Sequence, residues 1–377
     1  MGHTGTTGPG RRGQQQQRRQ RRRTTVLVAA GLVVAVALAL GTWLALAEGD
    51  DEVTSAVGSA PRSSAPTAPS TLPPTVPPTL PPTTTTTLPP GPPYALGVTR
   101  FTAVDLTRPT MARGPLPQRP TRELPMAVYY PTAGPATSPV AENAPVGPAT
   151  QYPLMIFAHG YSITAADYEP LIKDLAAQGF VVAAPDFPIS SLVFPGPASQ
   201  ADLPGQALDI RFLIDTLQNP SALPAVLQDK IAPGKVSVTG HSDGGVTVAA
   251  ASGNSCCLDP RIGASVALAG DQGGSLFRSG EWFQPTAPPQ MFIHGTADGD
   301  VPYSYSLKLY DDTVVTRYMV SIPGGVHWDP FVSGPERPAV VKLMTDFFRA
   351  YTLGDKDALA RIPTAANEGG LRLEASA

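Results

Sequence analysis

The pattern of apolar and polar positions divides the 377-residue chain into a long apolar run, a proline-rich stretch and a region of short alternating elements. Residues 26–47 carry no charged side chain, and a helix over them is about 33 Å long, enough to cross a bilayer core of about 30 Å. Residues 48–93 are rich in Pro and Thr and have too few apolar side chains to form a core. We therefore predict one folded domain over residues 94–354, followed by a tail over residues 355–377.

Within the folded region, short apolar runs predict strands, and the most continuous of them predict strands buried on both faces. The predicted strands cover residues 124–130, 154–158, 180–184, 236–238, 264–269, 290–294 and 316–322. Helical spacing predicts helices at residues 165–178, 207–217 and 345–351, and the proline-rich residues 134–148 predict a loop. Strands that alternate with helices indicate an α/β domain with a mostly parallel sheet flanked by helices.

Charge is distributed unequally about the apolar run. Residues 1–25 contain seven arginines and no acidic residue, which predicts a basic cytoplasmic tail by the positive-inside rule. The rest of the sequence contains 20 Lys and Arg and 30 Asp and Glu, which gives it a net charge of −10. This charge argues against nucleic acid as a partner.

The run at residues 26–47 is longer than a signal-peptide core, which favours an uncleaved transmembrane anchor. Ala45-Leu46-Ala47 also fits a cleavage site, and cleavage after Ala47 would give a secreted protein. We expect a single-pass protein of the cell membrane whose C-terminal domain is extracellular. Residues 48–93 would then form a disordered, semi-rigid linker outside the cell.

Residues 240–244, Gly-His-Ser-Asp-Gly, lie between a predicted strand and a run that can start a helix. A G-x-S-x-G pattern in this context is typical of a nucleophile elbow, in which a strained turn exposes the serine hydroxyl. Small glycines allow the strand and the helix to approach each other. This stretch predicts Ser242 as a nucleophile.

Active sites on parallel sheets form at the carboxyl ends of strands, so the residues after each predicted strand are candidates for its partners. Asp298 follows the strand at residues 290–294, and His327 follows the last predicted strand. We expect His327 as the base and Asp298 as the acid, with Asp271 and Asp300 as alternatives for the acid. The other four histidines end strands, lie in the elbow or lie in the N-terminal tail: His159, His294, His241 and His3.

Four motifs at the strand ends together resemble the α/β-hydrolase superfamily over residues 124–353. They are H-G-Y-S at residues 159–162, G-H-S-D-G-G at 240–245, H-G-T-A-D-G-D-V-P at 294–302 and G-G-V-H at 324–327. The sequence looks most like the dienelactone-hydrolase-like, cutinase and polyester-hydrolase group, with some likeness to platelet-activating-factor acetylhydrolases and chlorophyllases. In these last two families the acid follows the preceding strand, which is where Asp271 lies.

The resemblance implies the α/β-hydrolase fold and a reaction that needs no metal or other cofactor. Ser242 would attack an ester carbonyl, His327 would take its proton, and Asp298 would hold the imidazole. The oxyanion would be bound by two backbone N–H groups, those of Asp243, after the nucleophile, and, by likeness to polyester hydrolases, Tyr161. Asp243 is a departure from many relatives, which are apolar there, so we expect its carboxylate to point away from the site and bond to a loop donor.

The pocket and the two cysteines are less specific. Tyr161, Trp282, Phe283 and Trp328 are candidate pocket walls, and residues 192–194 are a candidate cap, but each also suits plain packing. Adjacent Cys256 and Cys257 indicate two buried thiols, with a vicinal disulfide as the alternative, and neither state predicts a metal site.

These features favour an extracytoplasmic serine hydrolase that cleaves carboxylic esters through a Ser-His-Asp triad and an acyl-enzyme. Its expected partners are a small-molecule, lipid or polymer ester and the membrane, through the N-terminal helix. A non-catalytic surface binding protein on the same scaffold is one alternative, although such a protein does not need all three triad groups. A serine peptidase of the same fold is the other, and the lack of a second large domain argues against it.

Overall fold

The computed structural model describes residues 92–277 and 280–376. The predicted cytoplasmic tail, the apolar segment at residues 26–47 and nearly all of the linker at residues 48–93 lie outside the described residues. Within the described ranges, no helix combines the length and the apolar character needed to span a bilayer.

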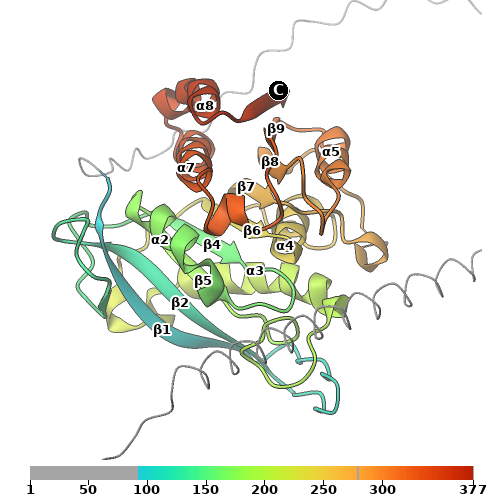
Figure 1. Cartoon of the computed structure of the whole chain (residues 1–377). Helices are drawn as coiled ribbons and strands as arrows, with labels where there is room; N and C mark the ends of the chain where they lie inside the picture. Colours follow the sequence, from blue (N-terminus) through green and yellow to red (C-terminus); the bar gives the residue numbers. More distant parts are fainter. Residues whose placement is uncertain (1–91, 278–279, 377) are drawn as a thin grey trace, which may run out of the picture. The chain divides into compact units, whose positions relative to one another are not determined.

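A ten-stranded mixed sheet organises the described residues (Figure 1). Its strands are β1 (Ala95–Asp105), β2 (Arg122–Thr132), β3 (Ala141–Glu142), β4 (Leu154–Ala158), β5 (Val181–Pro185), β6 (Val236–His241), β7 (Ile262–Leu268), β8 (Gln290–Gly295), β9 (Arg317–Ile322) and β10 (Arg372–Ser376). They lie in the order β10-β9-β8-β7-β6-β4-β5-β2-β1-β3. The six central strands from β9 to β5 are parallel, whereas β2 pairs antiparallel with β5, β1 with β2 and β10 with β9. The predicted mostly parallel sheet is confirmed.

Helices cover both faces of the sheet. They are α2 (Glu169–Ala177), α3 (Leu203–Leu217), α4 (Asp243–Gly253), α5 (Tyr303–Asp312), α6 (Asp329–Val332), α7 (Arg337–Leu353) and α8 (Lys356–Glu368), with short 3-10 turns η1 (Ala165–Tyr168), η2 (Gln200–Asp202), η3 (Pro220–Ala222), η4 (Ala225–Leu227) and η5 (Gly274–Phe277). Side chains of α3, α4 and α5 share one core with the sheet, and those of α2, α7 and α8 share the other. Along β4, Ile156 belongs to the first core and its neighbours Met155 and Phe157 to the second, which is why this strand is apolar at every position.

The C-terminal segment is part of the sheet and not a tail. The sequence predicted a tail over residues 355–377, but α8 packs on α7, and β10 pairs with β9 from Arg372 to Ser376. The buried residues of α8, Ala358, Ile362, Ala365 and Ala366, follow helical spacing and give this helix one apolar face. The folded domain therefore extends to the end of the described chain. Strand β1 at the other end was also not predicted, and it pairs with β2 along its whole length.

A buried ion-pair cluster ties the β1–β2 hairpin to α3. The guanidinium of Arg122 donates to Asp202 and to Asp209, with shortest N–O distances of 2.6 and 2.5 Å. All three side chains are at most 3% exposed. Burial alone would lower the pKa of Arg122, but the two aspartates outweigh it and raise that pKa. The charge is therefore kept because both carboxylates surround it.

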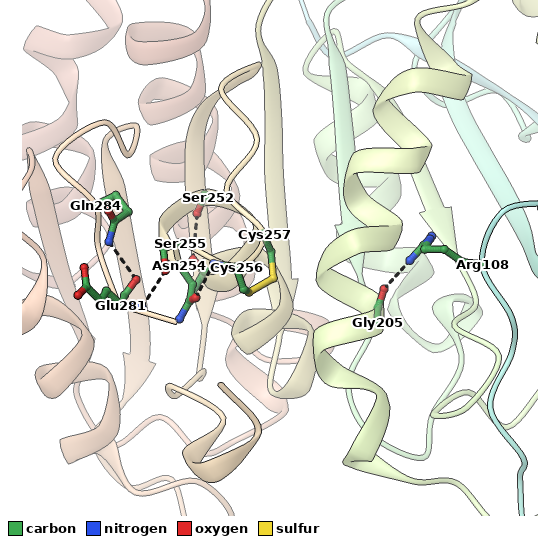
Figure 2. Close-up of a disulfide and its surroundings, with 10 residues drawn as sticks. Arg108, Gly205, Ser252, Asn254, Ser255, Cys256, Cys257, Glu281 and Gln284 are labelled. Carbon is green, nitrogen blue, oxygen red and sulfur yellow. Dashed lines mark hydrogen bonds between the residues drawn. A yellow bond between two sulfur atoms is a disulfide. The ribbon is translucent and has the colours of Figure 1, made fainter. Parts of the chain in front are cut away.

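The two cysteines are bonded to each other, as in the alternative to free thiols (Figure 2). The disulfide lies directly after α4, where Asn254 Oδ1 accepts the Cys256 N–H at 3.0 Å. Cys257 is buried and Cys256 is exposed, so the expectation of two buried thiols does not hold. The same turn bonds to the loop near Glu281, because the Glu281 N–H donates to Ser255 Oγ.

Candidate active site

Ser242 occupies the turn between β6 and α4 that the sequence predicted. Its backbone has φ 58° and ψ −122°, a conformation that L-residues rarely adopt and that costs about 1–3 kcal/mol. A Cβ at Gly244 would lie 2.0 Å from the Ala158 carbonyl oxygen, and one at Gly240 would lie 2.3 Å from the Gly244 carbonyl oxygen. Both glycines are thus required for β6, α4 and β4 to meet at the elbow.

His327 and Asp298 lie in the loops after β9 and β8, and the structure brings them together. His327 Nδ1–H donates to Asp298 Oδ2 at 2.7 Å. The other oxygen of Asp298 accepts the backbone N–H groups of Asp300 and Val301, each at 2.9 Å. Burial acts to raise the pKa of Asp298, but the bonds from Val301, His327 and Asp300 outweigh it and lower the pKa. Asp298 is therefore held as a carboxylate in a fixed orientation toward His327.

Neither alternative acid hydrogen-bonds to His327 among the described residues. Asp271 Oδ1 accepts the N–H of Gly273 within its own loop, and Asp300 is exposed. One oxygen or nitrogen from each of Asp298, Asp300 and His327 lies within 4.8 Å of the others, a spacing that could hold a cation. Both oxygens of Asp298 already accept hydrogen bonds, however, so a cation there would compete with His327.

A second histidine bonds to the same carboxylate. His294 Nε2 lies 3.0 Å from Asp298 Oδ2 and 3.1 Å from the Val301 carbonyl oxygen, and both of these only accept. A proton of His294 is therefore on Nε2, and Nδ1 lies 2.7 Å from Ser306 Oγ, which is also 3.2 Å from the Gly270 carbonyl oxygen. Burial lowers the pKa of His294, which agrees with a neutral ring. The sequence predicted a bracing role for this histidine without indicating its partner.

The loop after β4 positions the first candidate oxyanion donor, the N–H of Tyr161. His159 Nε2 accepts the Phe187 N–H at 3.0 Å, so its other nitrogen carries the proton and donates to the Gly160 carbonyl at 2.7 Å. The C=O and N–H of a trans peptide point in opposite directions, so this bond directs the Tyr161 N–H away from His159. A Cβ at Gly160 would lie 3.3 Å from Ser242 Cβ, which shows that the loop lies directly against Ser242.

Asp243 provides the second candidate donor. Its N–H lies in the first turn of α4, where helical N–H groups have no acceptor within the helix. Asp243 is 7% exposed, and its carboxyl bonds to a loop donor as predicted, since Gln200 Nε2 donates to Oδ1 at 2.8 Å. The other oxygen, Oδ2, is buried and has no hydrogen-bond partner among the described residues. Burial, opposed by Gln200 and assisted by Asp271, raises the pKa of Asp243 to about 6.

The loop that carries Gln200 is organised by an arginine that the sequence did not single out. The buried guanidinium of Arg113 donates to the carbonyl groups of Pro188, Ser191, Gly196 and Pro197 at 2.8–3.1 Å. Tyr161 Oη also donates to this loop, at the Ala198 carbonyl. Five carbonyl contacts are therefore held by two side chains, which explains how a loop with several prolines keeps one conformation.

The candidate pocket residues divide into exposed and buried sets. Tyr161 is 43% exposed beside the elbow, and Trp328 is half-buried against Tyr168. Phe283 is fully buried against Phe292, so it belongs to the core and not to a pocket wall. In the candidate cap, Leu192 and Val193 are exposed.

Sequence comparison finds similarity to known hydrolases over part of the chain. Residues 130–270 match the sequence model of the Chlorophyllase family. Chlorophyllase-1 of Arabidopsis thaliana is 30% identical over 145 residues, which are 38% of this chain and 42% of that protein. These matches fit the α/β-hydrolase superfamily that the four motifs resemble.

Platelet-activating factor acetylhydrolase of Gallus gallus is 39% identical over 56 residues, which are 15% of this chain and 13% of that protein. The chain thus spans less than half the length of the curated relatives it matches. Among solved structures, a ferulic acid esterase from Streptomyces cinnamoneus matches with a TM-score of 0.49 and 19% identity, covering 68% of this chain and 90% of that chain.

Proposed function

We propose that the protein is an extracytoplasmic serine hydrolase that cleaves carboxylic esters, with Ser242, His327 and Asp298 as its triad. The observation that carries the proposal is the bond from His327 Nδ1 to the buried carboxylate of Asp298, on a fold whose nucleophile turn presents Ser242. The match to the Chlorophyllase family supports ester hydrolysis as the reaction class.

In the proposed mechanism, Ser242 Oγ attacks the ester carbonyl carbon while His327 Nε2 takes the hydroxyl proton. Asp298 fixes the tautomer that leaves Nε2 free to accept, and it stabilises the imidazolium. The N–H groups of Tyr161 and Asp243 bind the oxyanion. His327 then gives its proton to the leaving alcohol, and water cleaves the acyl-enzyme by the same steps in reverse.

The extracytoplasmic location rests on the sequence of residues 1–93 alone. A basic segment before an uncharged run of membrane length supports a single-pass anchor with the catalytic domain outside the cell. The Pro/Thr-rich linker would separate the domain from the membrane. Small-molecule, lipid and polymer esters all remain within the proposed substrate class.

A fluorophosphonate probe tests the nucleophile. We expect the full chain to be labelled, Ser242→Ala to be unlabelled, and Asp298→Asn to be labelled much more slowly, because the wrong tautomer of His327 is then favoured. Asp271→Asn is the matched control and should be labelled at the wild-type rate. Folded wild-type protein that is not labelled would refute the proposal and favour a non-catalytic binding protein.

A further inference from the structure

We propose that Tyr168 and His241 are positioning residues of the proposed esterase, an inference that rests on the function argued above. Their side chains form a chain of hydrogen bonds between the loop after β4 and the backbone of His327. Gly160 N–H bonds to Tyr168 Oη at 3.1 Å, Tyr168 Oη lies 2.9 Å from His241 Nδ1, and His241 Nε2 lies 2.7 Å from the His327 carbonyl oxygen.

The two ends of this chain fix the direction of every bond in it. A backbone N–H only donates, so Tyr168 Oη accepts from Gly160. A carbonyl only accepts, so His241 Nε2 carries the proton that bonds to His327. A neutral His241 then has a lone pair on Nδ1, and the hydroxyl proton of Tyr168 points to it. With a protonated His241 the Tyr168 proton would lose this acceptor.

The surroundings of His241 keep the ring neutral. Burial, with a further contribution from neighbouring His327, lowers the pKa of His241 to about 3. Four aromatic or imidazole rings surround it, with centroid distances of 4.5 Å to His327, 5.1 Å to Phe331, 5.6 Å to Tyr168 and 5.8 Å to Trp328. His241 is 1% exposed, so bulk water does not reach its ring nitrogens.

The chain of hydrogen bonds begins and ends at residues that are next to, or part of, groups with a proposed role in the reaction. Gly160 precedes Tyr161, whose N–H is a candidate oxyanion donor, and His241 precedes the nucleophile Ser242. The third point of attachment is the backbone of His327 itself. The chain of hydrogen bonds therefore sets the distances among the oxyanion donor, the nucleophile and the base. Neither Tyr168 nor His241 is placed to touch substrate.

A purely structural role for these side chains makes a different prediction from a positioning role. Loss of a structural bond lowers stability without a specific effect on the chemical step. Loss of a positioning bond lowers kcat while KM, set by substrate contacts elsewhere, stays nearly constant. The two roles are separated by steady-state kinetics on folded variants.

The decisive variant is Tyr168→Phe in the full chain, assayed with p-nitrophenyl butyrate. It removes one oxygen atom and retains the ring. We expect kcat to fall at least about tenfold, because misplacement of reacting groups by about 1 Å costs up to about 10²-fold, and KM to change less than about twofold. Tyr130→Phe is the matched control, since Tyr130 is also fully buried and donates one bond, to the Ala144 carbonyl at 2.9 Å. Its kcat should equal that of the wild type.

Variants at His241 test whether the hydrogen bonds of Tyr168 and His241 act together. His241→Gln retains an acceptor and a donor on neighbouring atoms and should recover most of the activity that His241→Leu loses. Once His241→Leu has cut the chain, adding Tyr168→Phe should lower kcat little further, so the two effects should not add.

Three outcomes overturn the inference. Tyr168→Phe with wild-type kcat, or an equal loss in Tyr130→Phe, would show that the chain does not position the site. Fully additive effects of Tyr168→Phe and His241→Leu would show that the two residues act independently. Wild-type protein with neither ester turnover nor fluorophosphonate labelling would refute the proposed function itself and this inference with it. If the wild type is labelled and turns over ester normally, a negative result in the variants refutes this inference and leaves the proposed function intact.

Discussion

Replacement of Asp243 by Asn should change the pH dependence of stability. The pKa of this buried carboxyl is raised from 3.8 to about 6, so the folded state binds its proton more tightly than the unfolded state does. Its contribution to stability is complete below pH 3.8 and is lost as the pH rises to about 6. At about 1.4 kcal/mol per pKa unit, ionisation of this group costs the folded protein about 3 kcal/mol above pH 6. Asn does not titrate and escapes this cost.

The measurement is urea unfolding of wild type and Asp243→Asn between pH 4 and pH 8, followed by tryptophan fluorescence. We expect the free energy of unfolding of the variant, relative to wild type, to rise by about 2.4 kcal/mol between pH 4 and pH 7, because about 0.5 kcal/mol of the effect is already present at pH 4. Asp311→Asn removes an exposed carboxylate and should give a curve parallel to that of wild type. A constant difference between Asp243→Asn and wild type at every pH would refute the reasoning and indicate that Oδ2 has an unrecognised partner.

The same variant affects the proposed reaction. An ionised carboxyl on the residue whose N–H binds the oxyanion opposes the developing negative charge. The ratio of kcat for Asp243→Asn to kcat for wild type should therefore increase as the pH rises through about 6. A ratio that does not depend on pH would show that the carboxyl is too far from the oxyanion to affect it.

Three further predictions concern the buried ion pairs, a glycine of the elbow and the disulfide. Arg122→Met should lower the free energy of unfolding by about 3–5 kcal/mol in urea melts, because buried Asp202 loses its ion-pair partner and buried Asp209 keeps only Arg108; a loss below about 1 kcal/mol would contradict this. Gly244→Ala should prevent soluble expression, because its Cβ would lie 2.0 Å from a backbone oxygen; a folded variant with normal circular dichroism would show that the elbow can widen. The unfolded, unreduced chain should give no reaction with a thiol reagent and should react after reduction, whereas immediate reaction would exclude the vicinal disulfide.

The parts of the fold that could be predicted are those that a local pattern of residues in the sequence indicates. Strand β4 is apolar at every position because both of its faces are buried, and the elbow is a contiguous motif. Strand β1 alternates buried and exposed side chains only in its second half, and its partner β2 lies beyond a long loop. The helix α8 did carry a signal, in the spacing of its apolar residues, but no sequence feature indicated that β10 would pair with β9.

The candidate site also has residues that the sequence indicates and residues that it does not. Ser242, Asp298 and His327 could be named because each follows a strand end, and the fold brings the last two into contact. The partners that orient them could not be named, since bonds such as that from His241 to the His327 carbonyl join residues far apart in the sequence. Arg113 was also missed, because an arginine that bonds only to carbonyl groups has no acidic partner to suggest its role.

The distribution of satisfied and unsatisfied groups indicates where this site can be stabilised. On the acid side, both oxygens of Asp298 are occupied by donors from its own loop and from two histidines, so substitutions there remove favourable bonds. On the nucleophile side, Ser242 has a strained φ and Asp243 has a buried oxygen without a partner. Strain and unsatisfied polar groups are costs that function can require and folding does not. Stabilising substitutions should therefore be found around the elbow, where they would affect the proposed catalysis, and should be absent from the acid loop.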